Sequence, residues 1–252
     1  MKFGIRATAL LTAVAALLGG CAWLDDLADI GRLNGACGIA VDGSGSANAS
    51  SRGFDAMKEA HNTVEKFLDQ AGCRYVTFAP ISTAPESIKC GAPTLDLDPD
   101  DNGAQLDTDQ VRPQLRKQAL DSVEGLYQCI VKTQGERSTD VLGGMRLLMR
   151  QRPTEDGEYR LLIISDFIDT TPPAPILGPD LVTPAGRGRI IASISSRIPD
   201  LNGSDVTRAG FGKLFSNDST RMQALEAFWQ EVVVNRGKAS RLHDFGAAGG
   251  AA

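Results

Sequence analysis

Two kinds of apolar pattern alternate along the chain. Short runs of strand character are separated by longer segments in which apolar residues recur every three or four positions, a spacing typical of amphipathic helices. The predicted strands cover residues 38–41, 75–81, 86–90 (a short edge strand), 161–166 and 189–195. The predicted helices cover residues 53–71, 111–131, 141–149 and 222–233. This repeated alternation predicts one α/β domain over residues 35–236, a doubly wound, mainly parallel sheet with helices on both faces.

Two segments interrupt the alternation. Residues 92–110 are acidic and are expected to form an insertion. Residues 170–188 contain five prolines, which predict a long irregular loop because proline lacks the backbone N–H that helices and sheets need. This loop would leave from the end of the strand 161–166, so we expect it to form part of a binding rim; an insertion without a binding role is the alternative. Residues 237–252 are expected to form a flexible tail.

The N-terminal segment has the pattern of an export signal. Lys2 and Arg6 precede an apolar stretch that is short for a membrane span, and small residues lead to Cys21. This arrangement resembles the bacterial lipobox, which implies a signal peptide over 1–20, a lipid on Cys21 and a membrane-anchored tether over 21–34. If the host is Gram-negative, Ala22 favours the periplasmic side of the outer membrane. An ordinary cleaved signal and an uncleaved anchor are the alternatives.

Four further cysteines remain after Cys21, and in an exported chain they predict two disulfides. Three pairings are open. We expect Cys37–Cys73 and Cys90–Cys129, because Cys37 and Cys73 would begin neighbouring parallel strands. A zinc site is the alternative, but the chain has no close C-x-x-C pair.

The net charge of the 252-residue chain is −5, and its basic residues form no cluster in the sequence. Nucleic-acid binding depends largely on neutralising phosphates with Lys and Arg. We therefore expect no nucleic-acid partner.

Oxygen-bearing side chains follow two of the predicted strands and precede one helix. Asp42, Ser44 and Ser46 follow the first strand in the sequence CGIAVDGSGS, Thr139 precedes the helix 141–149, and Asp166 ends the strand 161–166. Carboxylates and hydroxyls suit Mg²⁺, Mn²⁺ or Ca²⁺ better than zinc. Loops beyond the carboxyl ends of strands are also where open α/β sheets bind ligands.

The D-x-S-x-S sequence, the later Thr and the later Asp together resemble the metal-ion-dependent adhesion site of von Willebrand factor A-like domains. The resemblance implies that Asp42, Ser44, Ser46, Thr139 and Asp166 hold Mg²⁺ or Mn²⁺, with Ca²⁺ as a third candidate. It also implies a protein partner whose carboxylate completes the metal shell. Two departures are visible: Phe167 stands where the family usually has Gly, and the gap between Ser46 and Thr139 is long.

A second metal site is suggested by the acidic insertion. Asp98, Asp100, Asn102, Gly103 and Asp109 match D-x-D-x-N-G-x5-D, which is close to the calcium-loop pattern. The alternative interpretation is a solvated acidic loop.

The sequence contains little that indicates a known class of enzyme. The only histidines are His61 and His243, and the serine loop does not match G-x-S-x-G. We therefore expect a binding module and not an enzyme. Two alternatives stay open: a module of the same fold that binds its partner without metal, and a metal-assisted hydrolase that uses Asp42 and Asp166.

Overall fold

The fold of the chain is given by a computed structural model. The structure describes residues 33–47, 54–99, 108–134, 138–153, 157–172, 176 and 178–246. These residues belong almost entirely to one compact unit, Asn34–Ala252. The signal peptide 1–20, Cys21 and most of the tether lie outside the described residues. Within the described ranges, no helix has both the length and the apolar character needed to cross a membrane.

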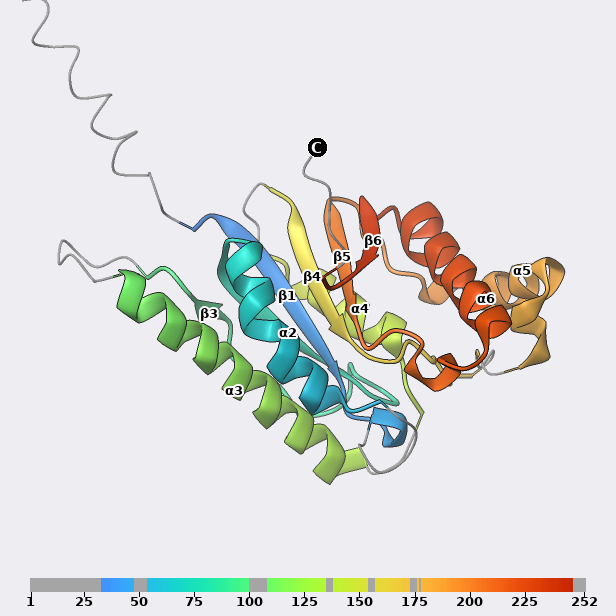
Figure 1. The fold of residues 1–252 in the computed structure, drawn as a ribbon, viewed down its shortest axis with the longest axis horizontal. Helices are drawn as coiled ribbons and strands as arrows, with labels where there is room; N and C mark the ends of the chain where they lie inside the picture. Colours follow the sequence, from blue (N-terminus) through green and yellow to red (C-terminus); the bar gives the residue numbers. More distant parts are fainter. Residues whose placement is uncertain are drawn as a thin grey trace, which may run out of the picture. The chain divides into compact units, whose positions relative to one another are not determined.

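A six-stranded sheet forms the centre of the fold, in the order β3-β2-β1-β4-β5-β6 (Figure 1). Its strands are β1 (Gly35–Asp42), β2 (Cys73–Ile81), β3 (Leu95–Asp96), β4 (Tyr159–Ile164), β5 (Ser204–Ala209) and β6 (Arg241–Asp244). All neighbouring pairs are parallel except β2 and the two-residue β3. The predicted α/β class with a mainly parallel sheet is therefore confirmed.

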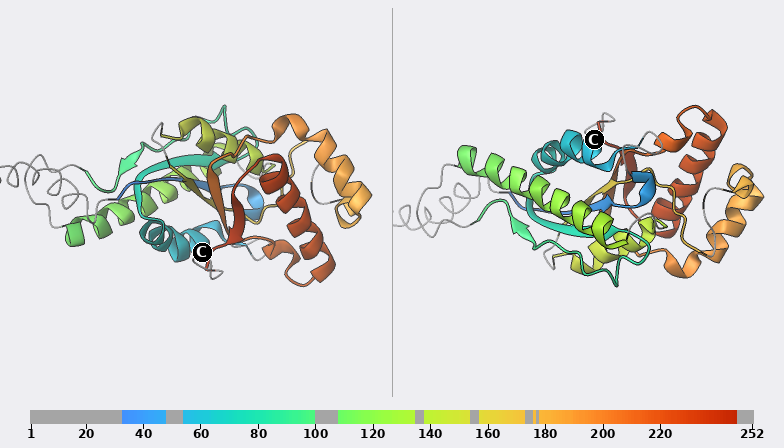
Figure 2. Two further views of the ribbon diagram at one scale, coloured as in Figure 1. Left: turned by 90° about the horizontal axis from the view of Figure 1, so that it is seen from above. Right: turned by 90° about the horizontal axis from the view of Figure 1, so that it is seen from below.

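Helices lie on both faces of this sheet and, in one case, beyond it. They are α2 (Ala56–Gln70), α3 (Thr108–Gln134), α4 (Val141–Gln151), α5 (Pro184–Ser193) and α6 (Ser219–Trp229), which continues as the π-helical turn η5 (Gln230–Arg236). Helices α2 and α4 lie on opposite faces, and α3 packs beside α2 against β1 and β2 (Figure 2). One hydrophobic core joins α4, α5 and α6 to the strands. Short 3₁₀ turns occur at η1 (Gly45–Ala47), η2 (Pro179–Val182), η3 (Ser195–Arg197) and η4 (Lys213–Phe215), and α5 lies beyond the sheet against η2.

Three helices begin at an aspartate. Asp55, Asp140 and Asp218 cap α2, α4 and α6 by accepting a hydrogen bond from a backbone N–H three residues ahead. Such caps satisfy N–H groups that have no partner inside the helix. The α4 cap matters for the site, because Asp140 follows Thr139 directly.

Both expected disulfides are present. Cys37–Cys73 joins the neighbouring strands β1 and β2, with a Cα–Cα distance of 5.7 Å. Cys90–Cys129 has the same Cα–Cα distance and ties the segment after β2 to α3. These two links fasten the part of the fold that precedes the Thr139 loop.

The prediction for residues 170–195 is wrong in two respects. Residues 189–195 are helical and not a strand, and the proline-rich segment contains η2 and the start of α5. Thr183 explains the helix start, because its side chain accepts a hydrogen bond from the Gly186 N–H at 3.1 Å and Pro184 takes the first helical position. Proline is well suited to that position because its missing N–H would have no partner there.

Three further expectations need correction. The segment 86–90 is not a strand, and the edge strand is β3, a few residues later. The predicted set of strands lacks β5, which is buried along its whole length. The region 237–252, expected to be a flexible tail, contributes β6 to the sheet, so the domain extends beyond residue 236 at least to Asp244.

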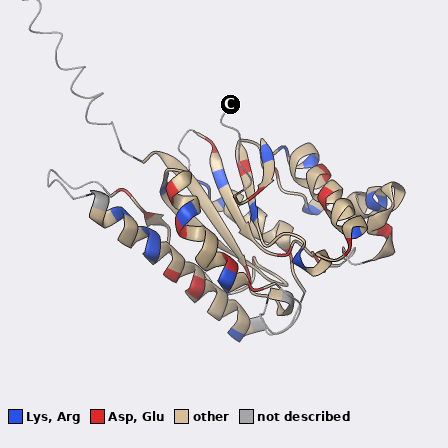
Figure 3. Cartoon of the chain, viewed as in Figure 1, with Lys and Arg blue, Asp and Glu red and all other residues tan. Residues whose placement is uncertain are grey.

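Charged residues of both signs lie along α3 (Figure 3). Arg116 of α3 pairs with Asp69 of α2, and Glu124 of α3 pairs with His61 of α2. His61 therefore belongs to the outer contact between two helices. His243, the other histidine, lies on β6 and contacts Asp205 of β5 at 3.1 Å.

Candidate functional site

The site is built around Asp42, the last residue of β1. Its side chain is 0% exposed. Val41 pairs with Ile164, so the parallel register of β1 and β4 brings Ser165 alongside Asp42. The Ser165 hydroxyl donates to Asp42 Oδ2 at 2.8 Å, and the Ser44 N–H donates to Asp42 Oδ1 at 2.9 Å. Both carboxylate oxygens thus accept hydrogen bonds from neutral groups of two different loops.

The Thr139 loop joins the same cluster. The Thr139 hydroxyl donates to the Ser44 hydroxyl oxygen at 2.7 Å, across 95 residues of sequence. Its backbone is fixed from the segment after β4: the Thr139 N–H donates to Thr170 Oγ1, and the Thr171 hydroxyl donates to the Thr139 carbonyl. Three segments that are distant in sequence therefore meet at the carboxyl end of the sheet.

Asp166 follows Ser165 and is 1% exposed. Its Oδ1 accepts from the Ile168 N–H at 3.0 Å, and its backbone carbonyl accepts from the Gly212 N–H at 3.1 Å. Of the five predicted ligands, Asp42, Ser44 and Thr139 are joined by hydrogen bonds, and Asp166 lies next to their partner Ser165. Ser46 lies in η1, and its side chain falls outside the described residues.

Phe167 has a glycine-like backbone. Its φ is +62°, in the left-handed region that bulky residues rarely adopt. Its ring is buried and makes edge contacts with Phe211 and Trp229, at centroid distances of 5.4 and 5.2 Å. The residue that departs from the von Willebrand factor A-like pattern thus takes the conformation that glycine favours.

The electrostatics of Asp42 favour a cation. Burial raises the pKa of the Asp42 carboxyl, and the hydrogen bonds from Ser44 and Ser165 only partly oppose this rise. Within the described part of the chain, no Lys, Arg or His forms an ion pair with Asp42. A buried carboxylate that has only neutral partners is costly, and a bound cation would remove that cost.

The donor types at the site fit a hard divalent metal. Asp42, Ser44, Thr139 and Asp166 offer carboxylate and hydroxyl oxygens, which suit Mg²⁺ and Mn²⁺. The described residues contain no group of three or more His, Cys, Asp or Glu side chains that could hold a metal ion. The hydroxyls of Ser44 and Thr139 are further oxygen donors available to a metal shell at this site.

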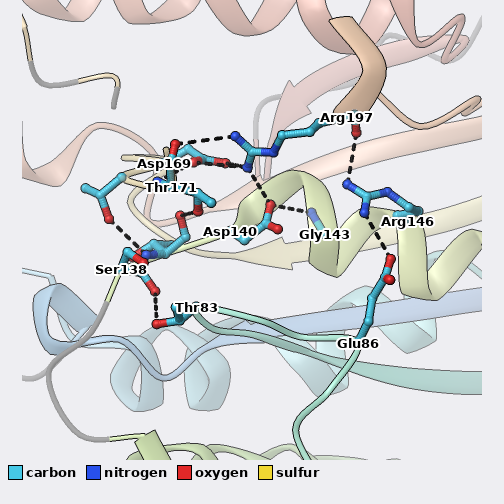
Figure 4. Close-up of polar contacts among 11 residues, drawn as sticks. Thr83, Glu86, Ser138, Asp140, Gly143, Arg146, Asp169, Thr171 and Arg197 are labelled. Carbon is cyan, nitrogen blue, oxygen red and sulfur yellow. Dashed lines mark hydrogen bonds and ion pairs between the residues drawn. The ribbon is translucent and has the colours of Figure 1, made fainter. Parts of the chain in front are cut away.

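A partly buried ion-pair network lies beside the site, and it was not predicted from the sequence. Arg197 Nη2 lies 2.8 Å from Asp140 Oδ1 and 3.3 Å from Asp169 Oδ2 (Figure 4). Burial raises the pKa of the Asp169 carboxyl to about 6, although the charge of Arg197 acts in the opposite direction. Asp140 could have been suspected because it neighbours Thr139. Nothing in the sequence links it to Arg197, 57 residues later.

The acidic insertion is only partly described. Asp98 is ion-paired with Arg112 of α3, with Oδ1 at 2.9 Å from Nη2 and 3.2 Å from Nε. Asp100 and Asn102 lie outside the described residues, as does the side chain of Asp109 in the first turn of α3. The calcium site stays a prediction, and calcium at Asp98 would compete with Arg112.

Comparison with models of protein families finds no match to the chain, and comparison with curated proteins finds no significant sequence similarity. The case for a function therefore depends on the site itself.

Proposed function

We propose that the chain is a lipid-anchored module of the cell envelope that binds a protein partner through a divalent metal. The metal is held by Asp42, Ser44, Ser46, Thr139 and Asp166. The observation that carries the proposal is the buried hydrogen-bond chain from Thr139 through Ser44 and Asp42 to Ser165. It gathers oxygen donors from three loops around a carboxylate that has no ion pair within the described residues.

The proposed metal is Mg²⁺ or Mn²⁺, with Ca²⁺ as a third candidate. Two carboxylates balance the charge of a divalent ion, and hydroxyls complete the coordination without adding charge. Once bound, the ion supplies a positive centre at which an acidic side chain of the partner can bind. This mode of binding, and the order of the five residues, is what the resemblance to von Willebrand factor A-like domains implies.

The proposed location follows from the N-terminal pattern. A lipid on Cys21 would anchor the domain to a membrane, on the periplasmic side of the outer membrane if the host is Gram-negative. Labelling cells with a fatty-acid analogue tests this part, with Cys21→Ser as the control that should remain unlabelled. Labelling that persists in Cys21→Ser would refute the anchor.

Calorimetric titration of the purified protein with Mg²⁺, Mn²⁺ and Ca²⁺ tests the metal site. We expect Mg²⁺ or Mn²⁺ to bind, and Asp42→Asn to abolish binding because it removes the central carboxylate. Asp55→Asn is the matched control. It changes another Asp near the same loop, and Asn still caps α2.

The same titration distinguishes the Asp42 site from the acidic insertion, and metal-dependent from metal-independent binding of a partner. If only Ca²⁺ binds and Asp98→Ala removes it, the metal belongs to the acidic insertion. If metal binds as expected but a partner's affinity does not change with Asp42→Asn, the module binds that partner without metal. If no metal binds at millimolar concentration, with or without a partner, the proposed function is wrong.

A further inference from the structure

Arg197 connects the two loops that carry Thr139 and Asp166. It lies in η3, after α5, and its side chain is only 17% exposed. On one side Nη2 contacts Asp140, which follows Thr139 and caps α4. On the other side Nη2 contacts Asp169, three residues after Asp166. One guanidinium thus reaches both loops from a third segment.

The charge of Arg197 also offsets the repulsion between the two carboxylates that it contacts. Asp140 and Asp169 repel each other, and the proximity of Asp140 contributes to the raised pKa of Asp169. Removing Arg197 would leave the buried carboxylate of Asp169 without its cation, and an uncompensated buried charge is destabilising. Without Arg197, the two carboxylates would favour separation of the loops that hold them.

The backbone of Arg197 is itself held in place. Its carbonyl accepts a hydrogen bond from Arg146 Nη2 at 3.1 Å, and Arg146 Nη1 pairs with Glu86 at 2.9 Å (Figure 4). Arg146 belongs to α4, the helix that Asp140 caps. Arg197 is therefore anchored on the same helix whose first turn it helps to position.

We propose that Arg197 is a positioning residue for the metal site. It fixes the Thr139 loop against the loop after Asp166, so that the Thr139 hydroxyl stays directed at Ser44. As a result, any partner that displaces α5 or η3 would change the affinity of the site for metal. The effect on metal rests on the proposed function, whereas the effect on loop position does not.

Three variants distinguish an effect on the position of the loops from a general loss of stability. Arg197→Met removes the charge but keeps an unbranched apolar stem like that of Arg, and Arg197→Lys keeps the charge without the planar fork. Arg187→Met is the matched control, because Arg187 lies nearby in α5, its side chain donates to the carbonyls of Leu181 and Val182, and it forms no ion pair among the described residues. All titrations are made where circular dichroism shows each variant to be folded.

Two measurements test the proposal. The first is hydrogen–deuterium exchange without metal, read at the backbone amides of Thr139, Gly143 and Thr171. We expect Arg197→Met to speed exchange at these amides and Arg187→Met to leave them unchanged.

The second measurement is calorimetric titration with Mg²⁺ and Mn²⁺. We expect roughly tenfold weaker binding for Arg197→Met, typical of the loss of a group that orients a metal ligand. Arg197→Lys should restore part of the affinity.

Every outcome is informative. If the native protein binds metal and Arg197→Met binds it equally well, the positioning role is refuted and the metal site survives. If the native protein binds no metal but exchange quickens in the two loops of Arg197→Met, the proposed function fails and the positioning role holds for the loops alone. Unchanged exchange in Arg197→Met refutes the positioning role whatever the metal result.

Discussion

The indole Nε1 of Trp229 donates a hydrogen bond to the backbone carbonyl of Phe167 at 2.9 Å. Trp229 ends α6, whereas Phe167 lies in the segment just after β4, next to Asp166. The hydrogen bond and the ring contact between the two residues hold the turn at Phe167 in its left-handed conformation. The position of Asp166 thus depends on an aromatic cluster that reaches across the core to α6.

The first prediction concerns the strain at Phe167. Phe167→Gly should lower the free energy of unfolding by about 2–4 kcal/mol, because losing a buried aromatic ring costs about 3–5 kcal/mol and glycine relieves about 1 kcal/mol of backbone strain. Phe167→Ala loses the ring but keeps the strain. It should therefore be about 1 kcal/mol less stable than Phe167→Gly in urea unfolding, and the reverse order would contradict the strain at this position.

A second prediction compares the free energy of unfolding of the native protein and of Asp42→Asn, without and with metal. Without metal at pH 7, Asp42→Asn should raise the free energy of unfolding, because burial disfavours the charged carboxylate of the native protein. With metal at 100 times its dissociation constant, the native protein should gain about 2.7 kcal/mol and the variant nothing. Thermal unfolding with and without Mg²⁺ measures both effects. A variant that is less stable without metal and still gains from it would contradict both parts.

The third prediction is a pH dependence that arises from Asp169. Its pKa is about 6 in the folded protein, above the ordinary value of 3.8, so the folded state binds the proton more tightly than the unfolded state. The loss of folding stability caused by the charged Asp169 carboxylate is therefore complete above about pH 6, and it disappears as the pH falls below 3.8. Relative to Asp169→Asn, the native protein should gain about 2.4 kcal/mol of stability between pH 7 and pH 4. Urea unfolding of both proteins across this range measures the difference, and a constant difference would show that the carboxyl does not titrate there.

The fourth prediction compares the two disulfides. Their sequence separations are similar, at 36 and 39 residues, so loop entropy assigns each about 4 kcal/mol. Cys37 and Cys73 are both 0% exposed, however, whereas Cys129 is partly exposed. Replacing Cys37 and Cys73 by Ala should therefore destabilise the protein more than replacing Cys90 and Cys129. Urea unfolding of the two double variants under oxidising conditions tests the order, and equal losses would show that burial adds nothing.

The strands that could be predicted from the sequence are the apolar ones. Residues of β1, β2 and β4 form continuous buried runs, and their polar ends mark where the site lies. Strand β5 was missed because it carries charged residues although all six of its positions are buried. Arg208 illustrates the reason: it is 4% exposed and pairs with Glu226 and Asp244, partners that come together only in the folded chain.

The candidate site was predictable to a similar extent. Asp42, Ser44 and Thr139 could be selected because strand ends and oxygen donors are visible in the sequence, and hydrogen bonds join them in the structure. Ser165 was passed over although it precedes Asp166, because only the register of β1 and β4 reveals that it faces Asp42. Helix α5 was predicted as a strand because apolar residues at 190, 191 and 194 suit either a strand or a helix. Its start at Thr183 and Pro184 lies within a proline-rich stretch that predicts a loop.

The order of strands bears on how the sheet can be assembled during synthesis. Among the strands that the structure describes, β1 leaves the ribosome first. β2 and β3 then extend the sheet on one side of it, and β4, β5 and β6 extend it on the other. Each new strand therefore joins an edge that already exists, and none has to insert between two paired strands. The sheet can grow in the direction of translation, although the site itself is complete only after β4 has paired with β1.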